Sequence, residues 1–353
     1  MTISSTLTTL CAACVLLFSS CKKTNSSNAT ATTTTGVTVS TLAGSGKQGD
    51  DNGTASMASF FDPVGLCVNN DGDVLVTDYG NGVIRKIAVS TGLVSNFAGN
   101  VLRNQYCDDG VGEGASFNNP EGIYANANGD IFVASDGCGM RTINSGGAVK
   151  TLWKNDIDNP ITAYPAFACA DNQGNVYTIS MDNGADSHIY KIDNQGKISL
   201  FAGTGAYGYK DGAVLSAQFG YIEGICIDNN NDIFVADGSR IREITGGQVR
   251  TVAGGTSGYA DGTGINAQFP GIAGICIDGK GNLYVSDGAD GRIRKIDPQG
   301  VVITVAGDGN PGYKDGAAAS AEFNTPHGLC VDAQGNLLVA DFRNNRIRKI
   351  SFK

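Results

Sequence analysis

The 353-residue sequence is poor in the residue types that most often carry catalysis or bind nucleic acid. It has two histidines, one tryptophan, and 25 lysines and arginines against 34 acidic residues. The resulting formal net charge of −9 argues against nucleic acid or an anionic membrane surface as a partner, because both attract a basic face. The sequence contains no Ser-His-Asp motif, phosphate-binding loop, dinucleotide-binding fingerprint or paired zinc-cysteine spacing. Proline is also scarce, whereas 50 glycines without a collagen period indicate many tight turns between short elements.

The N-terminal segment has the pattern of an export signal. Its apolar run "LCAACVLLF" is too short to cross a bilayer and is followed by small residues and Cys21. The stretch "VLLFSSC" resembles the lipobox of bacterial lipoproteins. This resemblance implies that residues 1–20 are a signal peptide, that Cys21 is lipidated, and that this lipid anchor is the only membrane attachment. A plain signal peptide is the alternative. We therefore expect a protein of the bacterial cell envelope that faces the periplasm or the cell surface.

Residues 21–38 are rich in serine and threonine, contain no acidic residue and offer little to pack. This composition predicts a disordered tether. At roughly 3.3–3.6 Å per residue, such a tether would reach about 55–60 Å when fully extended. No other segment has the composition of a linker, so residues 39–353 are expected to form one domain, and we expect that domain to be monomeric.

An internal repeat organises the remaining chain. The segment "NTPHGLCVDAQGNLLVADFRNNRIRKI" is the clearest copy, and "GIAGICIDGKGNLYVSDGADGRIRKI" is a second one. Each copy contains short runs of β-type residues separated by turn residues, so the repeat predicts a four-stranded antiparallel unit. The six copies occupy residues 62–87, 119–143, 163–192, 221–244, 271–296 and 324–350. Six such units predict an all-β, six-bladed β-propeller.

The strand count also predicts how the ring closes. A fourth-strand run such as "VITVAG" follows each of the first five copies, but the last copy ends at Lys353 without one. The missing run is "VSTLAG", residues 39–44, which precedes the first copy. We expect this N-terminal strand to join the C-terminal blade.

The repeat pattern P-x-G-[IL]-x-[VI]-D-x-x-G-N-[LI]-[YLF]-V-[AS]-D-…-N-x-R-I is clearest at residues 326–347. In this pattern the chain resembles the NHL-repeat family of six-bladed β-propellers over about residues 39–353. The resemblance implies the fold. It leaves the function open, because this family includes binding scaffolds, sensors and a few enzymes.

Two groups of cysteines have different positions in the repeat. Five of them occupy one repeat position in five copies and are expected to be small core residues: Cys67, Cys169, Cys226, Cys276 and Cys330. Cys107 and Cys138 are unique to the second copy and fall in loops that should lie on the same face of the ring. Because an exported protein can be oxidised, these two cysteines are candidates for a disulfide.

Acidic and basic residues also recur with the repeat. Asp237 ends a second strand and Arg242 lies in the next one, and both positions repeat in other copies. Repetition favours a structural role, in which charge-assisted hydrogen bonds tie a loop to a strand. In the long loop "YKDG", Asp211 is expected to form a turn, and calcium binding by such loops is the alternative.

One repeat position breaks the pattern in a suggestive way. Immediately before the first strand of each copy lie Val64, Glu121, Ala166, Glu223, Ala273 and His327. In a six-bladed ring, Glu121, Glu223 and His327 would converge on the channel mouth from alternate blades. Two carboxylates and an imidazole could bind a divalent metal, Zn or Ca. Otherwise they would form a solvated polar lining with His327 hydrogen-bonded to Glu121 or Glu223.

The family resemblance adds an enzymatic alternative for this mouth. Some six-bladed propellers hold a metal on the axis, namely an NHL-type amidating lyase with zinc and lactonase propellers with calcium. The resemblance therefore implies that Glu121, Glu223 and His327 would be the ligands of a metal-dependent lyase or lactone hydrolase.

The third copy is the most degenerate one. Ser180 replaces the strand-end aspartate and Tyr190 replaces the arginine, while Trp153 and Tyr164 lie close by in sequence. These three aromatic residues, Trp153, Tyr164 and Tyr190, could contact a glycan or a peptide. The alternative is a degenerate blade packed by tryptophan. We expect His188, in the same copy, to lie at the surface.

The function most consistent with these features is non-catalytic binding of a protein or a glycan. We expect this binding to use the face that bears the long loops and the channel mouth, because a repetitive fold is a rigid platform and its irregular positions carry specificity.

Overall fold

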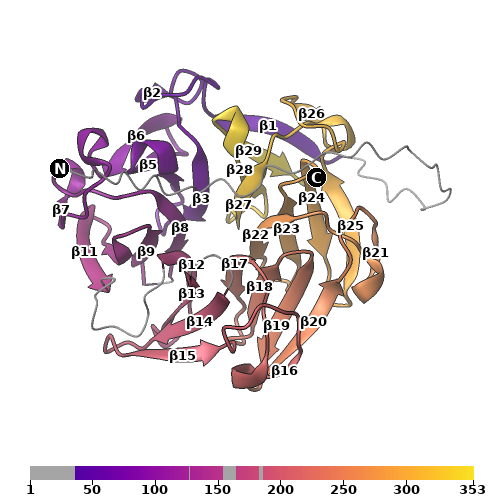
Figure 1. Ribbon diagram of the computed structural model, residues 1–353. Coiled ribbons are helices and arrows are strands. Elements are labelled where there is room, and N and C mark those ends of the chain that lie inside the picture. Colours follow the sequence, from indigo (N-terminus) through magenta and orange to yellow (C-terminus); the bar gives the residue numbers. More distant parts are fainter. Residues whose placement is uncertain (1–35, 127, 154–163, 183–185) are drawn as a thin grey trace, which may run out of the picture. The chain divides into compact units, whose positions relative to one another are not determined.

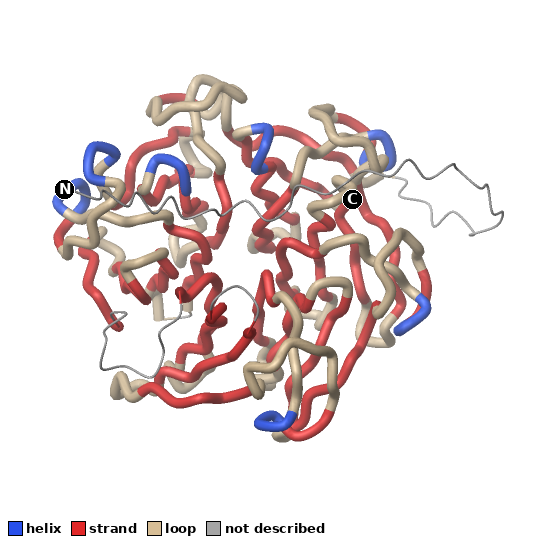
Figure 2. The backbone as a smooth tube through the Cα atoms, in the orientation of Figure 1, coloured by secondary structure: helices blue, strands red, loops and turns tan. Residues whose placement is uncertain are grey.

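The computed structural model describes residues 36–126, 128–153, 164–182 and 186–353. The expected signal peptide, Cys21 and most of the expected tether lie outside the described residues. Six antiparallel sheets form the blades of a propeller, and each blade extends from the centre to the rim (Figures 1 and 2). Among the described residues, no helix is long and apolar enough to span a membrane. The predicted all-β, six-bladed fold is confirmed.

From the inner strand the chain runs outward through the main strands of each blade, whereas the short outermost strands and β1 come earlier in the sequence. From the inside outward, the strands of the first three blades are β3 (Pro63–Val68), β4 (Val74–Asp78), β5 (Val83–Ala88), β6 (Leu93–Ala98) and β2 (Gly53–Thr54); β8 (Pro120–Ala125), β9 (Ile131–Ser135), β10 (Gly139–Ile143), β11 (Ala148–Trp153) and β7 (Gly110–Val111); and β12 (Tyr164–Ala170), β13 (Val176–Asp182), β14 (Asp186–Ile192) and β15 (Ile198–Ala202). Those of the last three blades are β17 (Ile222–Ile227), β18 (Ile233–Asp237), β19 (Arg240–Thr245), β20 (Gln248–Gly254) and β16 (Gly212–Ala213); β22 (Ile272–Ile277), β23 (Leu283–Asp287), β24 (Arg292–Ile296), β25 (Val301–Ala306) and β21 (Gly262–Thr263); and β27 (Pro326–Val331), β28 (Leu337–Asp341), β29 (Arg346–Ser351), β1 (Thr38–Ala43) and β26 (Gly316–Ala317).

The blades differ from the predicted four-stranded unit in one respect. Five sheets gain a two-residue outer strand, which comes from the long loop before the blade and pairs with the fourth strand; for example, Gly212 lies opposite Val249. The sheet of blade 3 has four strands. Pairing with the rim therefore holds one end of each long loop.

The N-terminal strand closes the ring as predicted. In β1, Val39 lies opposite Ile350 of β29, so the first strand of the domain completes the last blade. Around the centre, each inner strand contacts the inner strand of both neighbouring blades (Figure 1). A ring closed in this way leaves no large sheet face uncovered.

The hydrophobic core lies between adjacent blades. One cluster joins Cys67 and Leu75 of blade 1 to Ile123 and Ile131 of blade 2, and similar clusters lie between the other blades. The inner strands are apolar at consecutive positions because both of their faces pack against a blade. The five repeated cysteines are free thiols; four of them are buried, and Cys330 is partly buried.

The two faces of the ring have different connections. On one face, tight turns join the first two strands of a blade, and an aspartate such as Asp278 accepts the backbone N–H groups of Lys280 and Asn282. We call this the turn face. The opposite face bears the long loops between blades and the starts of the inner strands, and we call it the loop face.

Candidate binding face and channel mouth

In five of the six blades, a buried arginine fastens the long loop of the loop face to its blade. In blade 4, the Arg242 guanidinium lies 2.7 Å from the strand-end carboxylate of Asp237 and 2.7 Å from the loop carboxylate of Asp211. It also donates to the carbonyls of Gln218 and Lys210 and lies 5.1 Å above the ring of Phe219. We call this arrangement the arginine latch. Comparable latches are formed by Arg85, Arg141, Arg294 and Arg348.

The latch confirms that these repeated charges tie a loop to a strand and refines the role of the loop aspartates. Asp211 was expected to form a turn, but its carboxylate binds Arg242 and also accepts the backbone N–H of Thr251 in the fourth strand, β20. These contacts already use both carboxylate oxygens of Asp211. The loop aspartate is therefore a structural link between the loop, the third strand and the rim.

Blade 3 has an apolar substitute for the latch. Trp153 is 6% exposed and Tyr190 is 8% exposed, and both belong to one hydrophobic cluster with Met140 and Ile192. The prediction that Trp153 and Tyr190 contact a ligand at the surface is therefore wrong, because both rings are buried in the core between blade 2 and blade 3, which lacks the arginine. The alternative, a degenerate blade packed by tryptophan, holds. The side chain of Tyr164 lies outside the described residues.

A second fastening holds the loops at their tips. Tyr209 stacks on Arg240 with 3.9 Å between the guanidinium carbon and the ring centroid, and the pairs in blades 5 and 6 are equivalent: Tyr259 with Arg292 at 3.8 Å and Tyr313 with Arg346 at 3.7 Å. His188 takes the place of the arginine in blade 3 and is partly buried beside Gly205 of the following loop.

In blade 2 a disulfide replaces this stack. Cys107 lies two residues before Asp109, as Tyr209 lies two residues before Asp211, and Cys138 precedes the strand position that Arg240 occupies in blade 4. The sulfur atoms of Cys107 and Cys138 are bonded at 2.05 Å. The disulfide thus connects the same two loops that the Tyr–Arg pair connects elsewhere.

The channel mouth is built by a bulge in each inner strand. In every blade the pairing between the first and second strands shifts register around the mouth position, as between Pro120 and Ile123 in blade 2. Bulges of this kind re-aim a side chain out of the sheet. Hydroxyl groups fix the surrounding backbone: Thr77 of blade 1 donates to the carbonyl of Glu121 in blade 2.

The mouth brings Glu121 and Glu223 close enough for their charges to interact. Burial, together with the nearby carboxylates of Asp136 and Glu223, raises the pKa of Glu121 to about 8. Burial also raises the pKa of Glu223, although its side chain keeps contact with solvent. An acid with a pKa near 8 holds a proton at neutral pH for most of the time, so the mouth carries less negative charge than its composition suggests.

His327 packs against aromatic rings instead of pairing with these carboxylates. Its imidazole is stacked on Phe167, with 5.9 Å between ring centroids and 15° between planes, and it also contacts Phe342 at 6.0 Å. Its Nδ1 atom is buried and makes no hydrogen bond with any described residue. Burial lowers the pKa of His327 to about 4, so the ring is neutral at pH 7. The expected hydrogen bond to Glu121 or Glu223 is absent from the described part of the chain.

Phe167 is the mouth residue that sequence reasoning missed. It comes from blade 3, whereas its partner His327 comes from blade 6 on the opposite side of the ring, so the two rings meet across the axis. The other five inner strands have glycine at this position, where a Cβ on Gly328 would lie 2.3 Å from the Val64 carbonyl of the next blade. The signal was present in the sequence as the single departure from that glycine.

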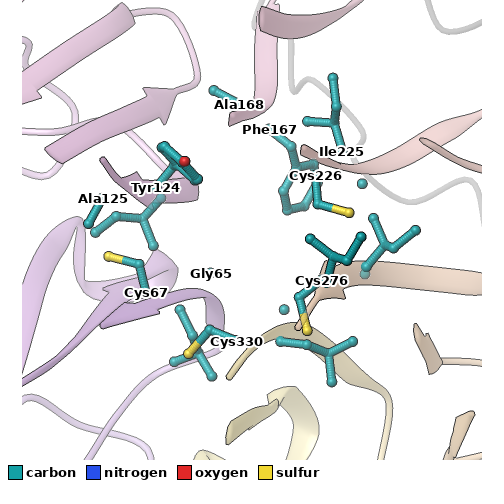
Figure 3. A pocket seen from close by; sticks show the side chains of 18 of the residues that line it. Gly65, Cys67, Tyr124, Ala125, Phe167, Ala168, Ile225, Cys226, Cys276 and Cys330 are labelled. Carbon is teal, nitrogen blue, oxygen red and sulfur yellow. The ribbon is translucent and has the colours of Figure 1, made fainter. Parts of the chain in front are cut away.

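Below the mouth, the channel is a cavity of about 290 Å³ lined by the inner strands of all six blades (Figure 3). Its lining includes Leu66, Tyr124, Phe167, Ile225, Ile275 and Leu329. Each inner strand is the edge of its sheet, so backbone groups that lack a strand partner also face the channel. Burial raises the pKa of the Cys67 thiol, which keeps this sulfur protonated and unreactive.

The mouth does not form a metal site with the predicted ligands. Over the described ranges of the chain, no group of three or more histidine, cysteine, aspartate or glutamate side chains is placed to hold one metal ion. His327 stacks on Phe167, and no interaction joins its imidazole to the carboxylate of Glu121 or Glu223 in the described part of the chain. We derive no metal-dependent step from this geometry.

Comparison with known proteins agrees with the repeat and the fold. A family model described as NHL repeat matches residues 60–87 and 323–350, which are copies in the first and last blades. The protein is a six-bladed β-propeller that contains NHL repeats. Among curated proteins, the chloroplastic protein SUPPRESSOR OF QUENCHING 1 of Arabidopsis thaliana is 43% identical over 60 residues. The match spans 17% of this NHL-repeat propeller and only 6% of the Arabidopsis protein.

Solved structures share the whole ring of this NHL-repeat propeller. A Bacteroides thetaiotaomicron protein of unknown function is 20% identical with a TM-score of 0.72, and an auxiliary nutrient binding protein of the same organism is 18% identical with a TM-score of 0.69; each comparison covers 89% of this chain and 76% of the other. A gluconolactonase from Xanthomonas campestris is 11% identical with a TM-score of 0.60 and 89% coverage of both chains. At these identities the likeness establishes the fold alone. The solved structures that share this fold include both binding proteins and enzymes.

Proposed function

We propose that this NHL-repeat propeller is a non-catalytic binding protein that holds a protein or glycan ligand on its loop face and channel mouth. The observation that carries the proposal is the contrast between the two faces. The turn face repeats the same tight turn, whereas the loop face displays long loops that are rigidly fastened and differ from blade to blade.

Rigid fastening favours binding because little conformational entropy is lost when a ligand is held. Three kinds of fastening converge on these loops: the arginine latch, the Tyr–Arg stack and the disulfide. Each fixes the loop backbone and leaves the residues between the fastenings exposed. The solved auxiliary nutrient binding protein with the same fold supports a binding role, and the expected N-terminal lipid anchor would place such a platform outside the cytoplasm.

The proposal is tested by finding a ligand and mapping where it sits. The full chain would be screened by affinity electrophoresis against soluble glucan, xylan and galactomannan and by calorimetry against a peptide mixture. For each probe that binds, amide hydrogen exchange would be compared with and without it. We expect protection in loop-face segments 204–218 and 255–268. Protection confined to turn-face segments 228–232 and 278–282, or binding of none of these probes, would overturn the proposal.

A further inference from the structure

A cluster of three tyrosines, Tyr207, Tyr209 and Tyr221, lies on the loop face. The ring of Tyr207 lies 5.7 Å from that of Tyr209 and 5.6 Å from that of Tyr221, with interplanar angles of 70° and 62°. Tyr207 is 50% exposed and Tyr221 is 47% exposed, so both rings present surface to solvent. The cluster lies on blade 4, beside the irregular blade 3, and Tyr221 directly precedes the inner strand β17 that leads to Glu223.

Only one of the three tyrosines belongs to the repeat. Tyr209 corresponds to Tyr259 and Tyr313, and all three stack on an arginine. The position of Tyr207 is Ser257 in blade 5 and Pro311 in blade 6, and the position of Tyr221 is Gly271 and Thr325. These neighbouring blades fold with the same topology and without the two rings, so the fold does not require Tyr207 and Tyr221.

The cluster is held rigidly by its surroundings. Arg240 packs on one face of Tyr209, and glycines lie against the same ring: a Cβ on Gly220 would lie 2.7 Å from the Tyr209 hydroxyl. The hydroxyl groups of Tyr207 and Tyr209 are hydrogen-bonded at 3.1 Å. A fixed, exposed pair of rings is suited to contact, because few side-chain rotamers are lost on binding.

The charges around the rings select the chemical class of the ligand. A guanidinium already occupies one face of Tyr209, so a cationic ligand would meet positive charge there. Glu223 follows Tyr221 by two residues, about 7 Å along the strand, and would repel an anionic ligand. A neutral ring with an apolar face and hydroxyl groups at its edge fits both conditions, because its C–H face can pack on a tyrosine while its hydroxyls bond to the phenol oxygens.

Building on the proposed binding function, we infer that Tyr207 and Tyr221 form a carbohydrate-binding subsite for a neutral pyranose of a glycan chain. Tyr209 is the positioning residue, which orients Tyr207 through the hydroxyl hydrogen bond. Glu223, at the start of the neighbouring strand, would accept a hydrogen bond from a sugar hydroxyl when it is ionised.

The test uses substitutions that the repeat itself supplies. Tyr207→Ser and Tyr221→Thr introduce the residues found at Ser257 and Thr325, so the variants should keep the melting temperature of the wild type. Retardation of the full chain by soluble glucan, xylan and galactomannan would be measured by affinity electrophoresis, and the affinity for an oligosaccharide of the retarding polymer by calorimetry. We expect the double variant to lose at least about tenfold in affinity, and Tyr207→Trp to retain binding.

The matched control is Tyr106→Ser in blade 2, which removes an exposed tyrosine from a long loop outside the segments that the ligand is expected to protect. Its affinity for the polymer should not change. Retardation that persists unchanged in the double variant would overturn the subsite while leaving the binding function intact. Binding of tetramethylammonium with loss in the double variant would show a cation site instead. Binding of a peptide alone would overturn the subsite, and binding of no probe would overturn both proposals.

Discussion

Blade 4 and blade 3 differ in the side chain at one buried position of the third strand, which is charged in blade 4 and aromatic in blade 3. In blade 4 a fully buried arginine lies between two aspartates, the two loop carbonyls and a phenylalanine ring. In blade 3 the arginine position is Tyr190, which belongs to the same hydrophobic cluster as Trp153 of blade 2, and the strand-end aspartate is Ser180. An apolar core is thus compatible with the same four-stranded sheet. Buried ion pairs are often no more stabilising than apolar residues of similar volume, so the latch is not needed to form a blade.

The difference teaches what the latch does. The five blades with an arginine also have a loop-derived outer strand, and blade 3 lacks both within the described residues. In the latch, a buried arginine fixes the long loop against the third strand through directional hydrogen bonds. An apolar cluster lacks this directionality. The repeated charges therefore serve mainly to order the long loops, and less to stabilise the blades.

The largest expected effect comes from breaking one latch. Arg242→Met keeps much of the side-chain volume but leaves Asp237 buried without its cation, and it frees the loop aspartate Asp211. We expect a loss of about 3–5 kcal/mol in the free energy of unfolding, measured by urea denaturation. Amide exchange of loop 204–218 should rise more than that of the β19 core.

Arg103→Met is the matched control for this substitution. Arg103 also pairs with a carboxylate, Asp108, but the two side chains are 46% and 42% exposed. Surface ion pairs contribute about 0–1 kcal/mol, so the control should change stability by no more than that. Equal losses in the two variants would contradict the assignment of Arg242 as a fastening residue.

The second prediction tests whether the disulfide of blade 2 replaces a fastening. Cys107 and Cys138 are 31 residues apart in sequence, and a crosslink of that span typically contributes about 2–4 kcal/mol. The double substitution Cys107→Ser with Cys138→Ser should lower stability by that amount and increase exchange in residues 101–117. Addition of a reductant should lower the stability of the wild type and leave the double variant unchanged. A reductant effect of equal size on both proteins would show that another bond is responsible.

Repetition explains how much of this molecule could be predicted. The fold, the blade count and the closing strand β1 follow from a pattern that occurs six times, so each copy supports the assignment of the others. The two-residue outer strands could not be seen, because elements as short as Gly212–Ala213 leave no alternating pattern. The role of Asp211 was also hidden, since a loop aspartate is equally common in turns.

The site was predicted less well because its residues stand at positions where the copies differ from one another. Position alone placed Glu121 and Glu223 together at the mouth, but it could not show that His327 turns to Phe167. Trp153 and Tyr190 were predicted to be surface aromatics because the third copy departs from the repeat pattern. Without that pattern, inward and outward positions could not be distinguished. Unique residues within an intact frame, such as Tyr207, are the more informative signal.

The third prediction compares the Tyr–Arg stack with the disulfide as a loop fastening. Arg292→Met removes the guanidinium from Tyr259 and a carboxylate contact with Asp290, both partly exposed. Cation–π pairs at such sites are worth about 0.5–1 kcal/mol, up to about 2 when desolvated. We expect a loss of about 1 kcal/mol by urea denaturation, smaller than that of the disulfide variant. A loss as large as that of Arg242→Met would place the main fastening at the loop tip instead of in the latch.

The smallest effect is expected at the mouth, where it depends on pH. Burial and neighbouring carboxylates raise the pKa of Glu121 to about 8, above its ordinary value of 4.5, so the folded protein favours the protonated form. The favourable contribution of that proton is fully present below about pH 4.5 and is lost as the pH rises to about 8. Glu121→Gln mimics the neutral acid, so the free energy of unfolding of the variant should match that of the wild type near pH 4. At pH 8.5 it should exceed the wild-type value by about 1 kcal/mol. The gain is modest because the side chain keeps some solvent contact. Urea denaturation across this range gives the difference directly. A difference that stays constant from pH 4 to pH 9 would mean that Glu121 is not desolvated at the mouth, and the close approach of Glu121 and Glu223 would then have to be abandoned.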